Sequence, residues 1–142
     1  MDTILTLTDD PDDAFRELLN EGLNSHNHEQ AGYADRRSLA VVVGDTQTGK
    51  PLGGVLGRTS FGLLFIDLVY LPDALRGRDI GKRMIEMAEA EGRRRGCRAA
   101  VLYTISFQAP GFYEKLGWRV FGEIPCDPPG TSRVFMTKDL TT

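Results

Sequence analysis

The sequence has little cysteine, one tryptophan, no long apolar run and no excess of positive charge. Its two cysteines, Cys97 and Cys126, lie far apart and form no CxxC pair, which argues against a zinc site and a disulfide framework. No apolar stretch approaches the roughly 18 residues that a membrane helix needs. A formal net charge of −3 disfavours nucleic-acid binding driven by bulk electrostatics. We therefore expect no metal, no nucleic acid and no membrane partner.

The length and the N-terminus narrow the class of protein further. The chain begins Met-Asp-Thr-Ile, without the charged and apolar regions of a signal peptide, so we expect a cytoplasmic protein. Its 142 residues, 41% of them apolar, are enough to bury a core without disulfides or bound metals to stabilise it. We find no repeat, low-complexity tract or linker. The sequence thus predicts a single domain over residues 1–142.

Apolar periodicity and turn residues predict the element order β-α-β-β-β-α-β-α-β-β. Helices are expected from about residues 9–13 onward, over 79–95 and over 109–116, whereas 25–36 should be polar and irregular. Strands are expected over 3–7, 39–43, 52–60, 63–71, 99–105, 118–124 and 133–137. Short turns favour antiparallel pairs, and the strand-helix-strand unit over 63–105 should be parallel. The predicted fold class is α/β, with a mixed, mostly antiparallel sheet and helices on both faces.

A turn rich in glycine and arginine joins the strand over 63–71 to the helix over 79–95. Gly77 and Gly81 let the backbone approach a ligand closely. The first N–H groups of a helix are unpaired and lie at the positive end of its dipole. Four basic side chains surround the same point: Arg76, Arg78, Lys82 and Arg83. The turn therefore predicts a site for a phosphate-bearing ligand, with an ordinary strand-to-helix connection as the alternative.

A second glycine-containing segment, Gly44 to Lys50, has the Gly-x4-Gly-Lys spacing of a nucleotide-binding P-loop. Pro51 stands where that motif needs Ser or Thr for the metal, and a strand follows instead of a helix. We therefore interpret residues 44–50 as a hairpin turn and reject a nucleotide hydrolase.

Two motifs carry a resemblance to a known family. The turn reads Arg76-Gly77-Arg78-Asp79-Ile80-Gly81, and residues 106–118 read Ser-Phe-Gln-Ala-Pro-Gly-Phe-Tyr-Glu-Lys-Leu-Gly-Trp. They resemble the motifs Arg/Gln-x-x-Gly-x-Gly/Ala and Asn-x-x-Ala-x-x-x-Tyr-x-x-x-Gly-Phe of the GNAT superfamily of N-acetyltransferases. Asp79 replaces the first motif glycine, Ser106 replaces Asn, and Trp118 replaces Phe. The expected element order matches that family from about residue 3 to 140.

The resemblance implies an acetyl-CoA site. Backbone N–H groups of roughly 78–83 would hold the pyrophosphate, and the pantetheine arm would lie where the strand over 63–71 splays from that over 99–105. We expect Asp79 to cap the helix, with its carboxylate turned away from the phosphates. The positions that the resemblance assigns to the cosubstrate are Val69, Leu71, Arg76, Gly77, Arg78, Asp79, Ile80, Gly81, Lys82, Arg83, Ser106, Ala109 and Phe112.

The resemblance also implies direct attack of an amine on the acetyl carbonyl through a tetrahedral intermediate. Tyr113 matches the family's general-acid tyrosine, which would protonate the leaving thiolate. The alternative is a packing tyrosine whose hydroxyl bonds the backbone. Asp67 matches a position where the family often places an acid, and it would accept the amine proton through water; the alternative is an acid that orients substrate or pairs with a cation. Strand alternation predicts that Phe65, Asp67, Val69 and Leu71 share one face.

The acceptor cannot be identified from the sequence. In the resembling family the region after the first helix helps to form the acceptor pocket, which makes His26, His28, Glu29 and Tyr33 candidates for substrate contact. These histidines have no further ligands nearby, so we expect no metal there. A polyamine, an aminoglycoside-like antibiotic, an amino acid and a protein amine all stay open. The acidic balance slightly favours a cationic acceptor.

The function that the sequence supports best is acetyl transfer from acetyl-CoA to a primary amine. The alternatives are a transferase that uses another acyl-CoA and a non-catalytic coenzyme A-binding regulatory module of the same fold. The oligomeric state stays open: edge strands near the C-terminus could pair between subunits, and the resembling family often forms homodimers.

Overall fold

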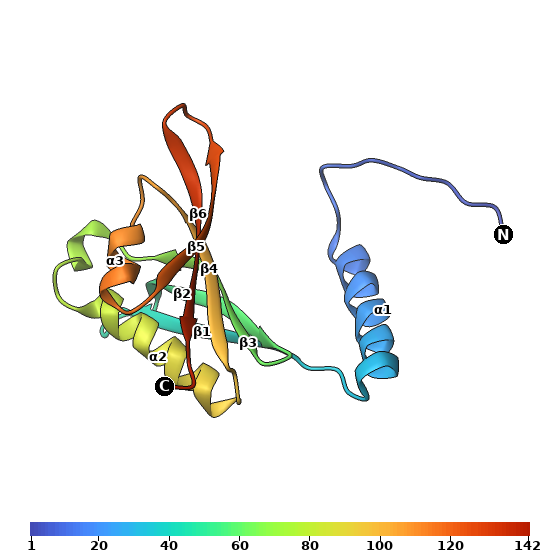
Figure 1. Ribbon diagram of the computed structural model, residues 1–142, viewed down its shortest axis with the longest axis horizontal. Helices are drawn as coiled ribbons and strands as arrows, with labels where there is room; N and C mark the ends of the chain where they lie inside the picture. The colour runs from blue at the N-terminus through green and yellow to red at the C-terminus, as the bar shows by residue number, and fades with distance from the viewer. The chain divides into compact units, whose positions relative to one another are not determined.

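The computed structural model describes all 142 residues, which fall into two compact units, Met1–Asp35 and Arg36–Thr142 (Figure 1). No helix in the structure has the length and apolar character needed to cross a membrane. The assignment of the whole chain to a single domain stays a prediction.

The first unit consists of an irregular N-terminal segment and the helix α1 (Asp13–Ala31). The predicted acidic start is confirmed, because the Asp12 side chain accepts a 2.8 Å hydrogen bond from the N–H of Phe15. The strand predicted over 3–7 is wrong, since these residues pair with no strand. The irregular segment predicted over 25–36 is also wrong in its first half: no glycine or proline interrupts α1 between residues 25 and 31, and Gly32, with a φ of 83°, ends it.

The second unit is built on a six-stranded sheet in the order β1-β2-β3-β4-β6-β5. Only the β3–β4 pair is parallel, and the other neighbours are antiparallel. The predicted fold class is therefore confirmed. The strands are β1 (Arg36–Gly44), β2 (Pro51–Ser60), β3 (Leu63–Tyr70), β4 (Ala99–Ile105), β5 (Arg119–Cys126) and β6 (Thr131–Asp139).

Two helices of this unit lie side by side, α2 (Ile80–Arg94) and α3 (Pro110–Lys115), and a short 3-10 turn, η1 (Asp73–Leu75), precedes α2 (Figure 1). The apolar face of α2 is buried in the core that the sheet provides. Gly92 allows this close packing, because a Cβ there would lie 3.2 Å from Leu64 Cδ2. The side chains of Leu64, Ile85 and Met136 are fully buried.

A buried polar cluster joins α2 to the C-terminal strands. Glu89, 2% exposed, accepts a 2.7 Å ion pair from Lys138 Nζ and a 3.2 Å hydrogen bond from Trp118 Nε1. Lys138 also donates to the Leu116 carbonyl at 2.7 Å. A buried carboxylate needs such partners, because desolvation of an unpaired charge is costly.

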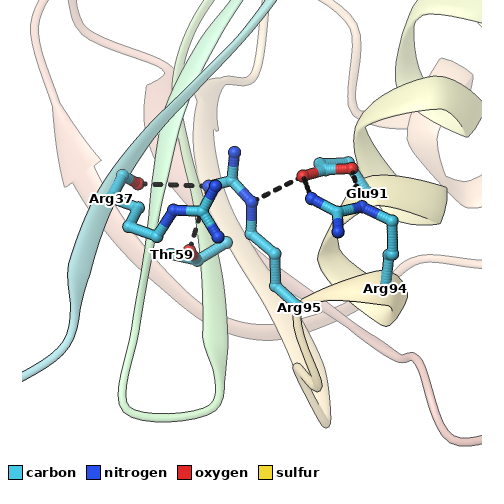
Figure 2. A network of polar contacts seen from close by, with 5 residues as sticks. All are labelled: Arg37, Thr59, Glu91, Arg94 and Arg95. Atoms are coloured by element: carbon cyan, nitrogen blue, oxygen red, sulfur yellow. Dashed lines mark hydrogen bonds and ion pairs between the residues drawn. The ribbon is translucent and has the colours of Figure 1, made fainter.

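A second polar network holds the C-terminal end of α2 against β1 and β2 (Figure 2). Arg95 donates to Glu91 at 2.7 Å, to Thr59 Oγ1 at 3.1 Å and to the Arg37 carbonyl at 3.4 Å. Arg94 also donates to Glu91, and these two guanidinium groups lower the pKa of Glu91 to about 2. The network thus anchors the C-terminal end of α2 to the sheet.

Candidate active site

The β3 and β4 strands separate in the middle of the sheet. Their parallel pairing covers only Leu63 to Phe65 on β3 and Ala99 to Val101 on β4. Beyond this point β3 continues to pair with β2 and β4 continues to pair with β6, but not with each other. The predicted splay is therefore present, and it opens a gap in the sheet whose edges carry backbone groups that no neighbouring strand uses.

A β-bulge on β3 causes a change of side-chain direction at this gap. Leu56 pairs with Leu68 while Gly57 pairs with Ile66, which leaves Asp67 as the extra residue. The prediction that Phe65, Asp67, Val69 and Leu71 share one face is therefore wrong. Before the bulge, Leu64 and Ile66 belong to the core and Phe65 stacks under Arg58; beyond it, Leu71 packs against that core.

Gly57 makes the bulge possible. A Cβ at this position would lie 2.3 Å from the Phe65 carbonyl oxygen, closer than any real side-chain carbon comes. Only glycine lets β2 approach β3 at the point where the register shifts.

Two cavities meet along the gap. One, of about 510 Å³, runs from Arg76 and Gly81 at the start of α2 along the end of β3 to α3. The other, of about 260 Å³, is lined by Asp67 on β3, Tyr103 on β4 and Arg133 on β6. The two cavities share four lining residues, Val69, Thr104, Gln108 and Tyr113. We call the first the α2-end cavity and the second the β6-side cavity.

Tyr113 stands at the junction of the two cavities. It is 7% exposed and packs edge-on against the rings of Phe112 and Trp118. Its hydroxyl makes no hydrogen bond within the protein, so the alternative of a hydroxyl bonded to the backbone does not describe this structure. Burial raises the pKa of the Tyr113 phenol above its usual range. The side chain therefore keeps its proton and can donate it to a group in either cavity.

Asp67 lines the β6-side cavity but is already paired. Its Oδ1 accepts from Arg58 Nη1 at 2.6 Å, and Arg58 also lies 4.5 Å from the centre of the Phe65 ring. The structure thus shows the cation pair that the sequence left open as the alternative to a base.

The turn before α2 presents a run of free backbone donors. None of the N–H groups from Gly77 to Lys82 donates to an acceptor in the protein, and the first helical bond of this segment is from Arg83 N–H to the Asp79 carbonyl at 3.0 Å. Gly77 (φ 78°) and Asp79 (φ 61°) flank Arg78 in left-handed conformations, an alternation that turns successive N–H groups into a concave anion site.

Asp79 does not cap the helix, contrary to the prediction. It occupies the N-cap position, yet its carboxylate accepts no hydrogen bond there. A capping side chain requires an extended backbone, whereas Asp79 is left-handed, a conformation that glycine adopts most easily and that Asp and Asn tolerate. The N–H groups are therefore left available.

The basic side chains around this turn differ in their pairing. Arg76 donates to the Leu71 carbonyl at 3.1 Å and pairs with Asp73 at 2.9 Å, and Lys82 lies 3.8 Å from Glu86. The remaining two, Arg78 and Arg83, form no ion pair within the protein. Two uncompensated cations thus lie at the free N–H groups.

The second motif surrounds the α2-end cavity. Phe112 packs over Gly81, where a Cβ would lie 3.3 Å from the end of its ring, and Ala109 lines the same cavity. Ser106 lines neither cavity, because its Oγ accepts from the Ser132 N–H at 3.0 Å and so joins the end of β4 to β6. A coenzyme role for these positions stays a prediction.

Gln108 and Arg133 are polar lining residues that the sequence interpretation did not assign to the site. Gln108 accepts from Thr104 Oγ1 at 3.0 Å and from the Ile105 N–H, which holds its amide at the junction. Arg133 comes from a strand far along the chain, and no motif singles it out. Gln108 lies inside the motif segment and could have been considered on that ground.

The candidates for acceptor contact all belong to the first unit. His26, His28 and Glu29 lie on α1 instead of in the predicted polar loop, and Tyr33 follows the helix. Their role in substrate binding stays a prediction.

The family follows from these features and from comparison with known proteins. Residues 4–118 match the model of the acetyltransferase (GNAT) family, which covers most of the chain. The protein therefore belongs to the GNAT acetyltransferases, and it is an acyltransferase.

Individual relatives agree with this assignment. The chain is 30% identical over 132 residues to an acetyltransferase of Agrobacterium fabrum, covering 93% of this chain and 96% of that protein. It is 37% identical over 95 residues to blasticidin-S acetyltransferase of Streptomyces morookaense, covering 66% of this chain and 70% of that protein. A crystal structure assigned as an acetyltransferase from Agrobacterium tumefaciens is 28% identical and superposes with a TM-score of 0.85, covering 96% and 99% of the two chains.

Proposed function

We propose that this protein transfers the acetyl group of acetyl-CoA to a primary amine by direct attack. The observation that carries the proposal is a continuous path: free N–H groups at the start of α2, then the splayed edge of β3, then the Tyr113 junction. The path offers positive backbone donors for phosphates and an edge with free peptide groups for an amide-containing arm. A protected proton donor stands at its end.

The residues present fit acetyl-CoA in chemistry as well as in layout. The concave run of N–H groups from Gly77 to Lys82, with Arg78 and Arg83 beside it, suits a pyrophosphate. The α2-end cavity suits the pantetheine arm, which Val69 and Leu71 would contact through their backbone. The Leu71 carbonyl already accepts a hydrogen bond from Arg76. We therefore assign the contact between Leu71 and the pantetheine arm to the Leu71 N–H.

Bound acetyl-CoA supplies the thioester carbonyl that a neutral amine attacks, and the coenzyme sulfur leaves as the amide forms. Tyr113 holds a phenolic proton where the leaving sulfur needs one. The carboxylate of Asp67 is engaged by Arg58, so we assign it the role of orienting the amine. Water in the open β6-side cavity then carries the amine proton away.

Calorimetric titration with acetyl-CoA tests the first half of this proposal, with ATP as the control. We expect micromolar binding of acetyl-CoA and no response to ATP. Absence of acetyl-CoA binding would overturn the proposed donor. Propionyl-CoA and succinyl-CoA in the same titration test the alternative of a different acyl donor, which tighter binding of either would favour.

Release of free thiol with a panel of amines tests the second half. Blasticidin S belongs in this panel because one relative is named for it, beside spermidine, kanamycin, lysine and a peptide with a free N-terminus. Amine-dependent thiol release with formation of the acetylated amine supports the proposal. Tight coenzyme binding with no thiol release from any amine would favour the non-catalytic module instead.

We also propose a homodimer, because β5 is an edge strand of the sheet and its backbone is free to pair with a second copy. Light scattering of the full chain tests this, and a monomeric mass at micromolar concentration would overturn it.

A further inference from the structure

Arg133 lines the β6-side cavity and has no acidic partner within the protein. Its Nε is the one buried side-chain nitrogen or oxygen atom in the protein without a hydrogen-bond partner. No acidic group pairs with its guanidinium, which lies 5.6 Å from the centre of the Tyr103 ring. Leaving a buried charged donor unpaired is costly, so native proteins satisfy almost all such donors. A guanidinium that lines a cavity and has no counterion points to a ligand that carries a negative group.

The charges that line the same cavity show which kind of ligand fits. Asp67 is the acid in the wall, and it is already neutralised by Arg58 at 2.6 Å. Arg133 is the basic residue in the wall, and it has no counterion. The cavity therefore contains one balanced pair and one unbalanced cation, and a ligand with a single negative group would restore neutrality.

The geometry of a guanidinium selects among negative groups. Its planar fork of N–H donors matches the two oxygens of a carboxylate, and the Tyr103 ring, 5.6 Å from the guanidinium carbon, gives Arg133 a cation–π contact. The cavity is small, about 260 Å³, and its lining includes Tyr113, which also lines the α2-end cavity from which the acetyl group would arrive. One compact molecule can thus reach both Arg133 and the reacting carbonyl.

We propose that Arg133 binds a carboxylate of the acceptor, so that the acceptor is an amine that also carries a carboxylate. This inference rests on the proposed function, since it takes the β6-side cavity as the acceptor site. Arg133 holds the carboxylate, Asp67 faces the amine, and the amine lies toward Tyr113. Arg133 is then a determinant of acceptor specificity, not of coenzyme binding.

Matched pairs of small amines test the proposal without knowledge of the natural acceptor. The probes are the ω-amino acids with three to six carbons, each beside its carboxamide, titrated into the full chain in the absence of acetyl-CoA. We expect at least one acid to bind about tenfold more tightly than its amide, the size expected for one charged hydrogen-bonded contact. It should also shift the Nε–H resonance of Arg133, which is assigned by its disappearance in Arg133→Lys.

Two variants of Arg133 separate the contribution of its positive charge from that of its forked N–H donors. Arg133→Gln should bind acid and amide equally, whereas Arg133→Lys keeps the charge, loses the fork and should retain part of the preference. Arg119→Gln is the matched control, because Arg119 lies exposed on β5 and lines neither cavity; it should leave the preference unchanged. All variants should bind acetyl-CoA as the wild type does.

Equal binding of acid and amide by the wild type at every chain length would overturn the proposal. An Arg133→Gln variant that is folded by circular dichroism and keeps the preference would also overturn it. Failure of the proposed function is distinguishable, because it appears as loss of acetyl-CoA binding in the wild type, while the carboxylate preference is measured without the donor.

Discussion

The two ends of the gap between β3 and β4 are built in different ways. At the start of α2, the functional groups are backbone N–H donors from one short segment, Gly77 to Lys82. In the β6-side cavity, they are side chains that arrive from separate elements: Asp67 from β3, Arg133 from β6 and Tyr113 from α3. A site made of local backbone depends on φ angles and free donors. A site made of distant side chains depends on the register of the whole sheet.

Tyr113 lies where the two ends meet, and its removal should have the largest effect. Tyr113→Phe deletes the proton donor but keeps the ring contacts, so we expect kcat to fall by about 100-fold, as for loss of a general acid, with acetyl-CoA affinity unchanged. Because burial raises the pKa of this phenol, the protonated form persists as pH rises, and wild-type kcat should show no loss from its ionisation below pH ~10. Steady-state kinetics with calorimetry measures both, and unchanged turnover would remove the assignment.

Gly57→Ala tests whether the arrangement of side chains in the β6-side cavity depends on the register of the sheet. The new Cβ would lie 2.3 Å from the Phe65 carbonyl, so the bulge must shift and we expect a loss of about 1–3 kcal/mol in unfolding free energy. Acceptor kinetics should suffer more than acetyl-CoA affinity, because Asp67 is the bulged residue. Gly22→Ala, in α1 with open space around it, is the control for a glycine with no close contact. Equal loss of donor and acceptor binding in Gly57→Ala would contradict the distinction between the two ends.

Glu91→Gln tests the polar network at the C-terminal end of α2, which lies outside both ends of the gap between β3 and β4. The pKa of Glu91 is lowered from 4.5 to about 2 by Arg94 and Arg95, so its ionised form stabilises the folded state. That stabilisation is present above pH ~4.5 and is lost as pH falls toward about 2. The difference in unfolding free energy between wild type and variant should therefore shrink over this range. A difference that does not change with pH would mean that the ion pairs of Figure 2 contribute nothing.

Asp79→Gly changes the turn at the start of α2, and it should have the smallest effect on ligand binding. The carboxylate makes no capping bond and the residue is left-handed, so glycine fits this conformation at least as well. We expect acetyl-CoA affinity within about threefold of the wild type, well under the 1.4 kcal/mol that a tenfold change represents. Gly77→Ala is the contrasting variant, because at φ 78° it introduces strain and should weaken binding more. A loss of tenfold or more in Asp79→Gly would show that the carboxylate is required.

Much of the second unit could be predicted because its signals are local. Residues 63–70 form the predicted strand, α2 begins within one residue of its predicted start, and Gly117 ends the predicted α3 region. The failures come from context. Residues 3–7 alternate weakly but pair with no strand, and the polar residues 25–31 extend α1 because nothing in them stops a helix before Gly32.

The sequence by itself determined the turn before α2 and the GNAT family of this protein, because both depend on residues adjacent in the chain, whose φ preferences and free donors act at short range. Only the tertiary structure decided which side chains line the β6-side cavity. The bulge at Asp67 reverses the alternation of β3, and the pairing of β6 with β4 brings Arg133 over Tyr103. Register between strands depends on turns, glycines and core packing across the whole sheet, and no local pattern contains it.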